Sequence, residues 1–298
     1  MARTNSPLRY PGGKSCLIEM TAALLRLNDL ERGHYAEPYA GGAGLALSLL
    51  YGGHVSDIHI NDIDPSVWAF WHCALNETDA LIDLVMNTPV TIEEWAAQRQ
   101  KYRDLYPRQK DGGEILALGF SAFFLNRTNR SGIIGGAGVI GGLKQQGNYK
   151  IDCRFNRDDL SRRIRRVGKY RDRIHLSKMD AIEFMHQKDK ELPKKSLMFI
   201  DPPYFHKGAA LYTSFYVAGD HADIAKSIST LRHPWVLTYD DVPEIRELYN
   251  AHRQYEFNIS YSVREKRKGA ELLVASKKLK LTDELVARQV PTQDQRVA

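Results

Sequence analysis

Four consecutive residues, Asp201-Pro202-Pro203-Tyr204, combine three groups that could act together on a flat, amino-bearing base. The aspartate and the Pro202 carbonyl can accept the two hydrogen bonds of an exocyclic amino group, and the tyrosine ring offers a stacking surface. An apolar run, Ser196 to Ile200, precedes them and predicts a strand. In open α/β sheets, ligands bind beyond the carboxyl ends of the strands. The alternative is a strand that ends in a rigid Pro-Pro turn.

A glycine-rich turn indicates a binding site for a nucleoside. Gly41, Gly42 and Gly44 follow a predicted strand, and glycines there let the backbone approach a ligand closely. The third glycine of a dinucleotide-binding fingerprint is replaced by leucine, so the turn does not require a pyrophosphate. Asp62 ends the next strand, where an acid can accept hydrogen bonds from ribose hydroxyls. This pattern favours a nucleoside cofactor without a diphosphate over a turn that only packs helix on sheet.

A third motif, Arg9 to Ser15, superficially suggests a phosphate loop because it ends in Gly-Gly-Lys-Ser. A Walker sequence needs a further glycine five residues before Gly13, and this chain has Leu8 there. The motif therefore does not favour a nucleotide hydrolase. Lys14 on its Pro-Gly-Gly turn could instead contact a carboxylate, such as that of a methionine moiety.

Strands and helices that would position these residues alternate along the chain. Strands are predicted over 34–37, 55–60, 174–177, 196–200 and 235–239, with a final antiparallel pair over 255–263 and 271–276. The first two strands enclose the glycine turn and an apolar helix, which is the opening of a βαβ unit. The pattern predicts an α/β fold with a doubly wound sheet.

The segment between the second and third strands has helical spacing of its apolar residues, and a glycine-dense hairpin or loop is expected around 126–150. We therefore expect residues 65–173 to form a helical insertion. The main domain would comprise 1–64 and 174–281, and a polar tail, 282–298, would follow and fray.

Positive charge is concentrated in two regions of the 298-residue chain, whose net charge is +6. Residues 126–173 hold 13 Lys and Arg against 4 Asp and Glu, and residues 263–280 hold 7 against 2. Such concentration favours a polyanionic partner through phosphate contacts, although a solvated helix face has the same composition. Two basic regions around a base-sized motif favour nucleic acid.

Composition also indicates the cellular compartment and excludes some classes of protein. Three widely separated cysteines suit neither a disulfide framework nor a zinc cluster, which indicates a reducing, cytoplasmic setting. The longest apolar stretch, 115–125, is too short to span a bilayer, and the start does not look like a signal peptide. No spacing of His, Asp and Glu suggests a metal. We expect neither a membrane nor a metal as a partner.

Four motifs in this order resemble the DNA adenine methylase (Dam-like, D12-class) family of N6-adenine methyltransferases. They are Tyr10-Pro-Gly-Gly-Lys14, Glu37 to Gly44, Ile60-Asn-Asp62 and Asp201 to Tyr204. The resemblance covers residues 6–280 and implies a Rossmann-like methyltransferase sheet with an inserted, mainly helical target-recognition domain. The family often has Trp where this chain has Tyr10, a conservative change for stacking.

The resemblance implies a site for S-adenosylmethionine next to a catalytic site. Lys14 would lie near the methionine end of the cofactor, Asp62 would hold its ribose and Asp180 would reach its adenine. The implied cofactor-binding residues are Tyr10, Lys14, Glu37, Gly41, Gly42, Gly44, Asp62, Asp180 and Asp201. The implied catalytic residues are Asp201, Pro202, Pro203 and Tyr204.

The implied reaction transfers a methyl group to N6 of an adenine flipped out of double-stranded DNA, and leaves S-adenosylhomocysteine. An N4-cytosine methyltransferase would use the same tetrapeptide geometry, but the motif order favours adenine. The same residues also allow a catalytically silent DNA-binding relative and, more distantly, a dinucleotide-dependent oxidoreductase. We expect a monomer or weak dimer, encoded by a bacterium or phage and nucleoid-associated when bound to DNA. A cognate restriction endonuclease is a candidate partner.

Arg reads guanine edges and Asn reads adenine edges, so the insertion contains candidates for base contacts. These are Asn126, Arg127, Asn129 and Arg130, whose alternative role is to support the loop. The other expected DNA-binding residues are Lys144, Arg162, Arg166, Lys266, Arg267 and Lys268.

Overall fold

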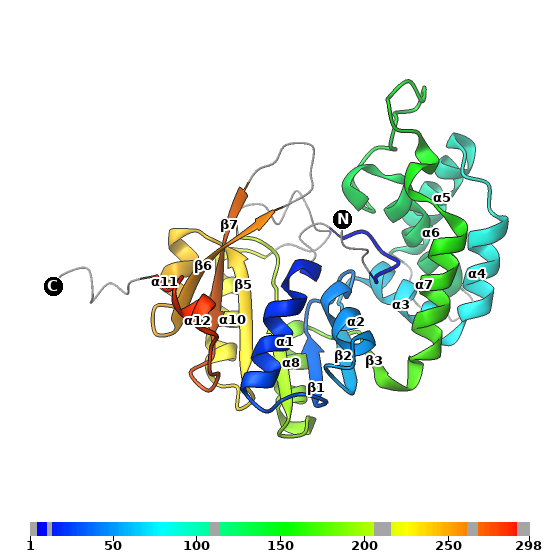
Figure 1. Cartoon of the computed structure of the whole chain (residues 1–298). Helices are drawn as coiled ribbons and strands as arrows, with labels where there is room; N and C mark the ends of the chain where they lie inside the picture. Colours follow the sequence, from blue (N-terminus) through cyan, green and yellow to red (C-terminus); the bar gives the residue numbers. More distant parts are fainter. Residues whose placement is uncertain (1–4, 11–13, 108–113, 206–215, 261–267, 291–298) are drawn as a thin grey trace. The chain divides into compact units, whose positions relative to one another are not determined.

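The computed structural model describes residues 5–10, 14–107, 114–205, 216–260 and 268–290 (Figure 1). The chain divides into two compact units, each assembled from segments that are distant in sequence. Unit 1 comprises residues 1–13, 41–44 and 61–178, and unit 2 comprises residues 14–40, 45–60 and 179–298.

Unit 2 is built on strands in the order β2-β1-β4-β5-β7-β6. Their bounds are β1 His34–Glu37, β2 Asp57–Asn61, β4 Ser196–Ile200, β5 Trp235–Asp240, β6 Arg253–Ser260 and β7 Lys268–Ala275. The first four of these strands run parallel, and β7 is antiparallel to both of its neighbours. The carboxyl ends of β1, β2, β4 and β5 therefore share one edge of the sheet.

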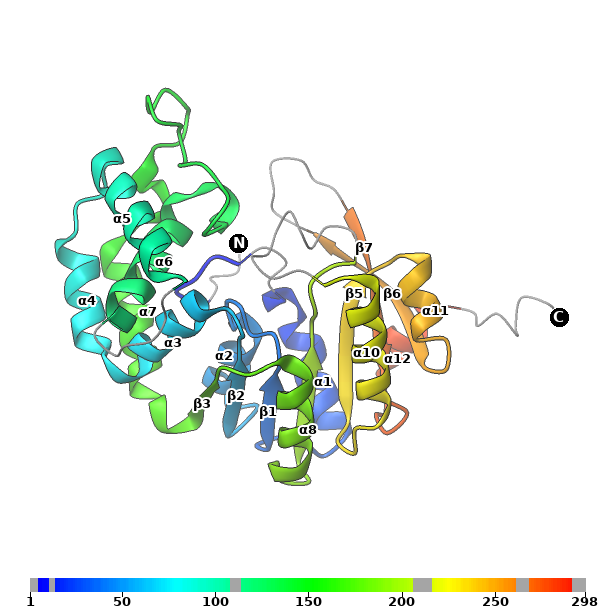
Figure 2. The same ribbon diagram turned by 180° about the vertical axis from the view of Figure 1, so that it is seen from behind.

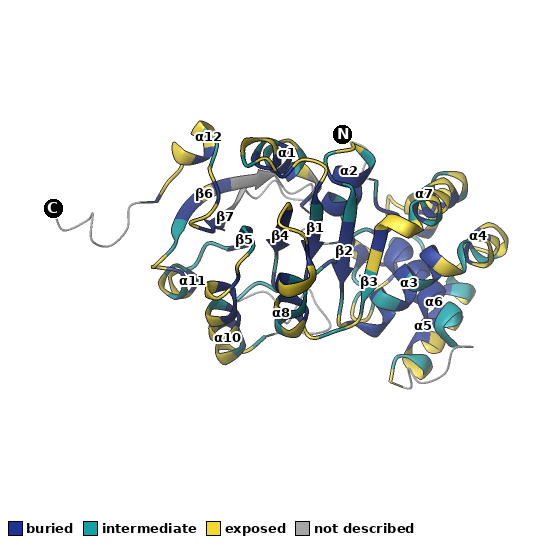
Figure 3. Cartoon of the chain, turned by 90° about the horizontal axis from the view of Figure 1, so that it is seen from below, coloured by how far each residue is buried: buried dark blue, intermediate teal, exposed yellow. Residues whose placement is uncertain are grey.

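Helices cover both faces of this sheet, as the view from below shows (Figure 3). On one face lie α1 (Ile18–Leu27), which follows the 3-10 turn η1 (Ser15–Leu17), and α2 (Gly44–Tyr51). On the other lie α8 (Ala181–Glu191), α10 (Ala218–Ser229) and α11 (Pro243–Leu248), whose apolar side chains form one core cluster with those of β4, β5 and β7. Because both faces are covered, every residue of β4 is buried.

Unit 1 is mainly helical (Figure 2). Its helices are α3 (Pro65–Asn76), α4 (Thr78–Asn87), α5 (Ile92–Leu105), α6 (Ile115–Thr128) and α7 (Arg157–Lys169). Shorter elements are the strand β3 (Ile174–Ser177) and the 3-10 turns η3 (Arg130–Gly132), η4 (Ile151–Arg154) and η5 (Arg171–Arg173). Helix α6 packs between α3 and α5, and Phe70 of α3 stacks on Phe123 of α6 with ring centroids 5.4 Å apart.

The α/β fold and its helical insertion, both expected from the sequence, are confirmed, but several boundaries differ. Helix α6 continues to Thr128, where the sequence predicted loop from residue 126, because the Thr128 hydroxyl donates to the Phe124 carbonyl and buried contacts hold the last turn. The described part of the tail forms α12 (Asp283–Val286), and the Val290 amide bonds to β6 at Gln254 instead of fraying. The glycine turn 41–44 groups with unit 1.

The close approach of α6 to α3 yields a test of this packing. Alanine normally stabilises a helix by about 1 kcal/mol relative to glycine. At Gly119, however, a Cβ atom would lie 2.8 Å from the Ala69 carbonyl oxygen of α3. We therefore expect Gly119→Ala to lower the melting temperature, at a cost of about 1–3 kcal/mol for overpacking.

Gly219 in α10 is the matched control, because a Cβ atom there would meet nothing within 4 Å. Gly219→Ala should leave the melting temperature unchanged or slightly raised when both variants are followed by circular dichroism. A Gly119→Ala protein that melts with or above the parent would contradict the α3–α6 packing.

Candidate functional site

The tetrapeptide Asp201 to Tyr204 follows β4 directly, at the carboxyl edge of the sheet of unit 2. The Asp201 side chain is 24% exposed, and its Oδ1 accepts a hydrogen bond of 2.7 Å from the Thr238 hydroxyl on β5. The same oxygen lies 3.1 Å from Lys14 Nζ. The neighbouring strand and a lysine distant in sequence therefore fix this carboxylate on one side.

Lys14 is the centre of a buried charge cluster. Its Nζ lies 3.1 Å from Asp201 Oδ1 and 3.1 Å from Oε2 of Glu271 on β7, and both the lysine and the glutamate are about 5% exposed or less. Burial disfavours the ammonium, but attraction and hydrogen bonds to the two carboxylates outweigh it and raise the pKa of Lys14. Lys14 is therefore a fixed cation.

Tyr204 joins the same cluster through its hydroxyl, which donates to Glu271 Oε1 over 2.8 Å. Lys14 Nζ also lies 5.5 Å from the centroid of the tyrosine ring. Burial raises the pKa of Glu271, and the positive charge of Lys14 works in the opposite direction. Glu271 is not among the residues predicted from the sequence, although a lone acid in the apolar run of β7 was the signal that could have found it.

Glu37 is buried at the end of β1, and its carboxyl group accepts a hydrogen bond from the first turn of α2. Its Oε1 accepts hydrogen bonds from the Tyr35 hydroxyl at 3.0 Å and from the Ala46 amide at 3.2 Å. Burial, with a smaller contribution from the charge of Asp201, raises the pKa of Glu37 to about 8 although these hydrogen bonds oppose the shift.

In unit 1 the glycine turn, Tyr10 and Asp62 come together as the sequence predicted. Gly41 has a φ of +46°, and a Cβ atom there would lie 2.6 Å from the Tyr10 ring, so only glycine fits. The Gly41 amide donates to Asp62 Oδ2 over 2.8 Å, and its carbonyl accepts from Trp71 Nε1 over 2.9 Å. Burial and the charge of nearby Asp64 raise the pKa of Asp62 to about 7.

Three further expected positions give less information about a ligand. Asp180 is exposed and caps α8, since its Oδ1 accepts from the amides of Ile182 and Glu183. Gly44 begins α2, and Gly42 packs against Tyr10. The residues between Tyr10 and Lys14 lie outside the described part of the chain.

Asn126, Arg127 and Asn129 are buried and bonded to backbone atoms within unit 1. Asn126 accepts from the Arg9 amide and donates to the carbonyls of Arg9 and Gly132, and Arg127 donates to the carbonyls of Arg154 and Pro7. Asn129 accepts from Trp95 Nε1 and donates to the carbonyls of Ile133 and Ile134. With their polar groups engaged this way, all three fit the alternative role, which is support of the loop.

The remaining basic candidates that the structure describes lie at the surface. Arg130, Lys144, Arg162 and Arg166 are exposed, and Arg162 forms an ion pair with Asp159 one turn earlier in α7. Lys266 and Arg267 fall outside the described residues, and Lys268 is the first residue of β7.

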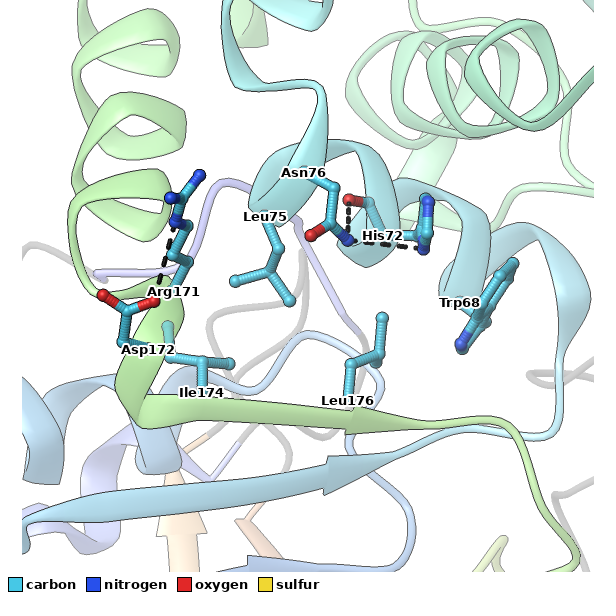
Figure 4. Close-up of a pocket in the computed structure, with 8 residues that line it drawn as sticks. All are labelled: Trp68, His72, Leu75, Asn76, Arg171, Asp172, Ile174 and Leu176. Carbon is cyan, nitrogen blue, oxygen red and sulfur yellow. Dashed lines mark hydrogen bonds and ion pairs between the residues drawn. The ribbon is translucent and has the colours of Figure 1, made fainter. Parts of the chain in front are cut away.

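A separate pocket of about 470 Å³ lies in unit 1 between α3 and β3 (Figure 4). Trp68, His72 and Asn76 line it from one side of α3, and Arg171 and Asp172 form an ion pair of 3.6 Å at its rim. None of the residues selected from the sequence lines this pocket.

Comparison with protein families decides the class. The family model described as D12 class N6 adenine-specific DNA methyltransferase matches residues 10–268. The chain belongs to this family. A comparison with curated proteins found no match.

Membership of the D12 class gives the chain its chemistry, which is S-adenosylmethionine-dependent methylation of adenine in DNA. The matched range includes the glycine turn, Asp62 and the tetrapeptide, so the resemblance expected from these motifs is confirmed. Among the described residues, no helix is long and apolar enough to cross a membrane, and no group of three His, Cys, Asp or Glu side chains could hold a metal ion. Metal-free catalysis stays a prediction.

The buried Glu37 generates a prediction about this methyltransferase that is independent of activity. Between its ordinary pKa of 4.5 and its folded value of about 8, folded Glu37 holds a proton that the unfolded chain releases. Glu37 therefore makes the protein less stable as pH rises through this window. We expect Glu37→Gln to be more stable than the parent at pH 9, with a difference that shrinks toward pH 4.5.

Urea unfolding of both proteins at several pH values measures this difference. A gain for Glu37→Gln that does not change with pH would assign the effect to packing rather than to the buried charge.

Proposed function

We propose that this DNA methyltransferase positions N6 of a flipped-out adenine with Asp201, the Pro202 carbonyl and the Tyr204 ring. The observation that supports this most directly is the anchoring of Asp201 through Oδ1 by Thr238 and Lys14. We assign Oδ2 to one N–H of the amine and the Pro202 carbonyl to the other. Two acceptors on one nitrogen favour a pyramidal geometry and aim its lone pair, and Pro203 keeps the following turn rigid.

The cluster of Lys14, Asp201 and Glu271 would stabilise the positive charge that develops on N6, and its Asp201 would accept the proton that N6 loses. When bound, S-adenosylmethionine supplies an electrophilic methyl group. As N6 gains the methyl group it becomes cationic, and Asp201 is the acceptor placed to stabilise that charge and to take up one of the amine protons. Lys14 is fully protonated and cannot act as the base. Because two carboxylates surround one ammonium, the cluster carries a net charge of −1, which favours positive charge at the base.

For the cofactor, we propose that Tyr10, the turn Gly41 to Gly44 and Asp62 bind its nucleoside portion. The Tyr10 ring takes the space that a Cβ atom at Gly41 would need, so the aromatic ring and the turn pack together. The Asp62 carboxylate has the chemistry to accept ribose hydroxyls. Glu37 and Asp180 remain proposed cofactor-binding residues on the basis of the family resemblance alone. Lys14 was expected at the methionine end of the cofactor, but it contacts the carboxylates of Asp201 and Glu271. We therefore propose that its role is to hold the Asp201 carboxylate in position.

For DNA, we propose that the exposed cations of unit 1 carry the contacts. Arg130 is the candidate for a base edge, and Lys144, Arg162 and Arg166 are candidates for phosphates. We also propose that the protein is a monomer or weak dimer, acts in the cytoplasm and binds double-stranded DNA. A cognate restriction endonuclease is its proposed protein partner. The N4-cytosine alternative is separated by nucleoside analysis of the methylated DNA.

Removal of the Asp201 carboxylate tests the catalytic assignment. Asp201→Ala should abolish transfer of labelled methyl groups to unmethylated DNA, because the amine loses its acceptor, while S-adenosylmethionine binding stays measurable by calorimetry. Asp223→Ala, at an exposed position of α10, is the control and should retain activity. Near-normal transfer by Asp201→Ala would overturn the assignment.

Replacement of single arginines separates base contacts from phosphate contacts. Arg166→Ala should weaken binding equally for all DNA sequences and lower the slope of log affinity against log salt by about 1. Arg130→Ala should change the set of adenines methylated in total DNA, as mapped by sequencing. Arg26→Ala, on an exposed position of α1, should change neither property. An unchanged methylation map for Arg130→Ala would assign that residue to phosphate or to no DNA contact.

A further inference from the structure

Glu271 is a buried acid in a strand whose other described central positions are apolar. It lies on β7 directly opposite Asp240 of β5 and Phe257 of β6, and its side chain is 3% exposed. Leu272, Leu273 and Val274, which follow it, are completely buried. An ionised carboxylate at such a position is costly unless charged and hydrogen-bonding partners compensate it. Its partners therefore indicate its role.

Those partners belong to the proposed catalytic group. Glu271 Oε1 accepts from the Tyr204 hydroxyl at 2.8 Å, and Glu271 Oε2 lies 3.1 Å from Lys14 Nζ. Lys14 in turn contacts Asp201 at 3.1 Å. A single carboxylate on β7 thus reaches both the aromatic ring and, through the lysine, the acid that flank the proposed position of the base.

The contact with Lys14 sets the acceptor strength of Asp201. If Lys14 had Asp201 as its sole carboxylate partner, the pair would be neutral and the ammonium would draw electron density from the acid that must accept the amine protons. Glu271 shares the ammonium and restores a net negative charge to the cluster. Because Lys14 and Glu271 are buried, solvent screens their charges little.

The contact with Tyr204 fixes the orientation of a stacking ring. A tyrosine that follows two prolines at the end of a strand has its backbone restricted, but its ring can still rotate about the side-chain bonds. The hydrogen bond from its hydroxyl to a buried carboxylate on another strand removes this freedom. Charge-assisted hydrogen bonds of this kind are stronger than neutral ones.

We propose that Glu271 is a positioning residue for methyl transfer, which holds the Tyr204 ring in place and shares Lys14 so that Asp201 keeps its full strength as an acceptor. This inference rests on the proposed catalytic roles of Asp201 and Tyr204. Glu271 acts through its neighbours and need not touch the base or the cofactor.

The test compares two substitutions that separate charge from shape. Glu271→Gln keeps the size of the side chain and its acceptor for Tyr204 but removes the charge, whereas Glu271→Asp keeps the charge and shortens the chain. We expect Glu271→Gln to lower kcat roughly 10- to 100-fold, with the S-adenosylmethionine Kd within about threefold of the parent. Glu271→Asp should retain more activity than Glu271→Gln, whereas a packing role predicts the opposite order.

Two further variants complete the design. Tyr204→Phe keeps the stacking ring and loses its tether, so kcat should fall several-fold while the melting temperature stays unchanged. Glu256→Gln, at an exposed position of β6 where the side chain pairs with Arg246, is the control and should keep full activity. Melting curves establish that each variant is folded, and if neither Glu271 variant folds, Tyr204→Phe still decides whether the tether matters.

The outcomes are distinct. The inference would be overturned if Glu271→Gln had a kcat within threefold of the parent, or if it were more active than Glu271→Asp. If the Glu271 variants do not fold, a fully active Tyr204→Phe would overturn it instead. Failure of the parent protein to methylate any DNA would instead overturn the proposed function, and with it the premise of the inference.

Discussion

The buried ion cluster around Lys14 is the interaction on which the proposed catalytic site depends. It joins the start of the chain, the end of β4 and the middle of β7, which no local sequence pattern would bring together. A buried ammonium needs carboxylate partners, and Lys14 has one on each side, from Asp201 and from Glu271. The cluster holds Asp201 in position, and in the proposed mechanism its negative charge stabilises the amine as it gains a methyl group.

The glycine turn shows a second constraint, in which backbone geometry rather than charge is decisive. Gly41 adopts a positive φ under the Tyr10 ring, and Asp62 and Trp71 hold its amide and carbonyl from different elements. The Asp62 carboxyl group and the Trp71 indole on α3 thus hold the turn in one conformation. Such rigidity limits the conformational entropy lost when a ligand binds.

Much of the fold was predictable because periodicity is a local property. The strands that precede Asp62 and Asp201 lie within a residue or two of their predicted ranges. The second follows from the apolar run that ends at Ile200, and the first follows from β-branched residues placed between Gly53 and Asn61. The role of Asn126 and Asn129 was not predictable in this way. An asparagine side chain suits a base edge as well as a backbone carbonyl, and both of these buried asparagines bond to carbonyls.

The sequence by itself determined the class of this protein, because the motifs and their order carry the D12-class methyltransferase signature across residues 10–268. Only the tertiary structure decided which charges meet. Lys14 and Glu271 are 257 residues apart, and their contact arises because β7 pairs antiparallel with β5 beside the strand that carries Asp201. Ion pairing of this kind depends on distances of a few ångströms, which strand pairing sets and residue spacing along the chain does not.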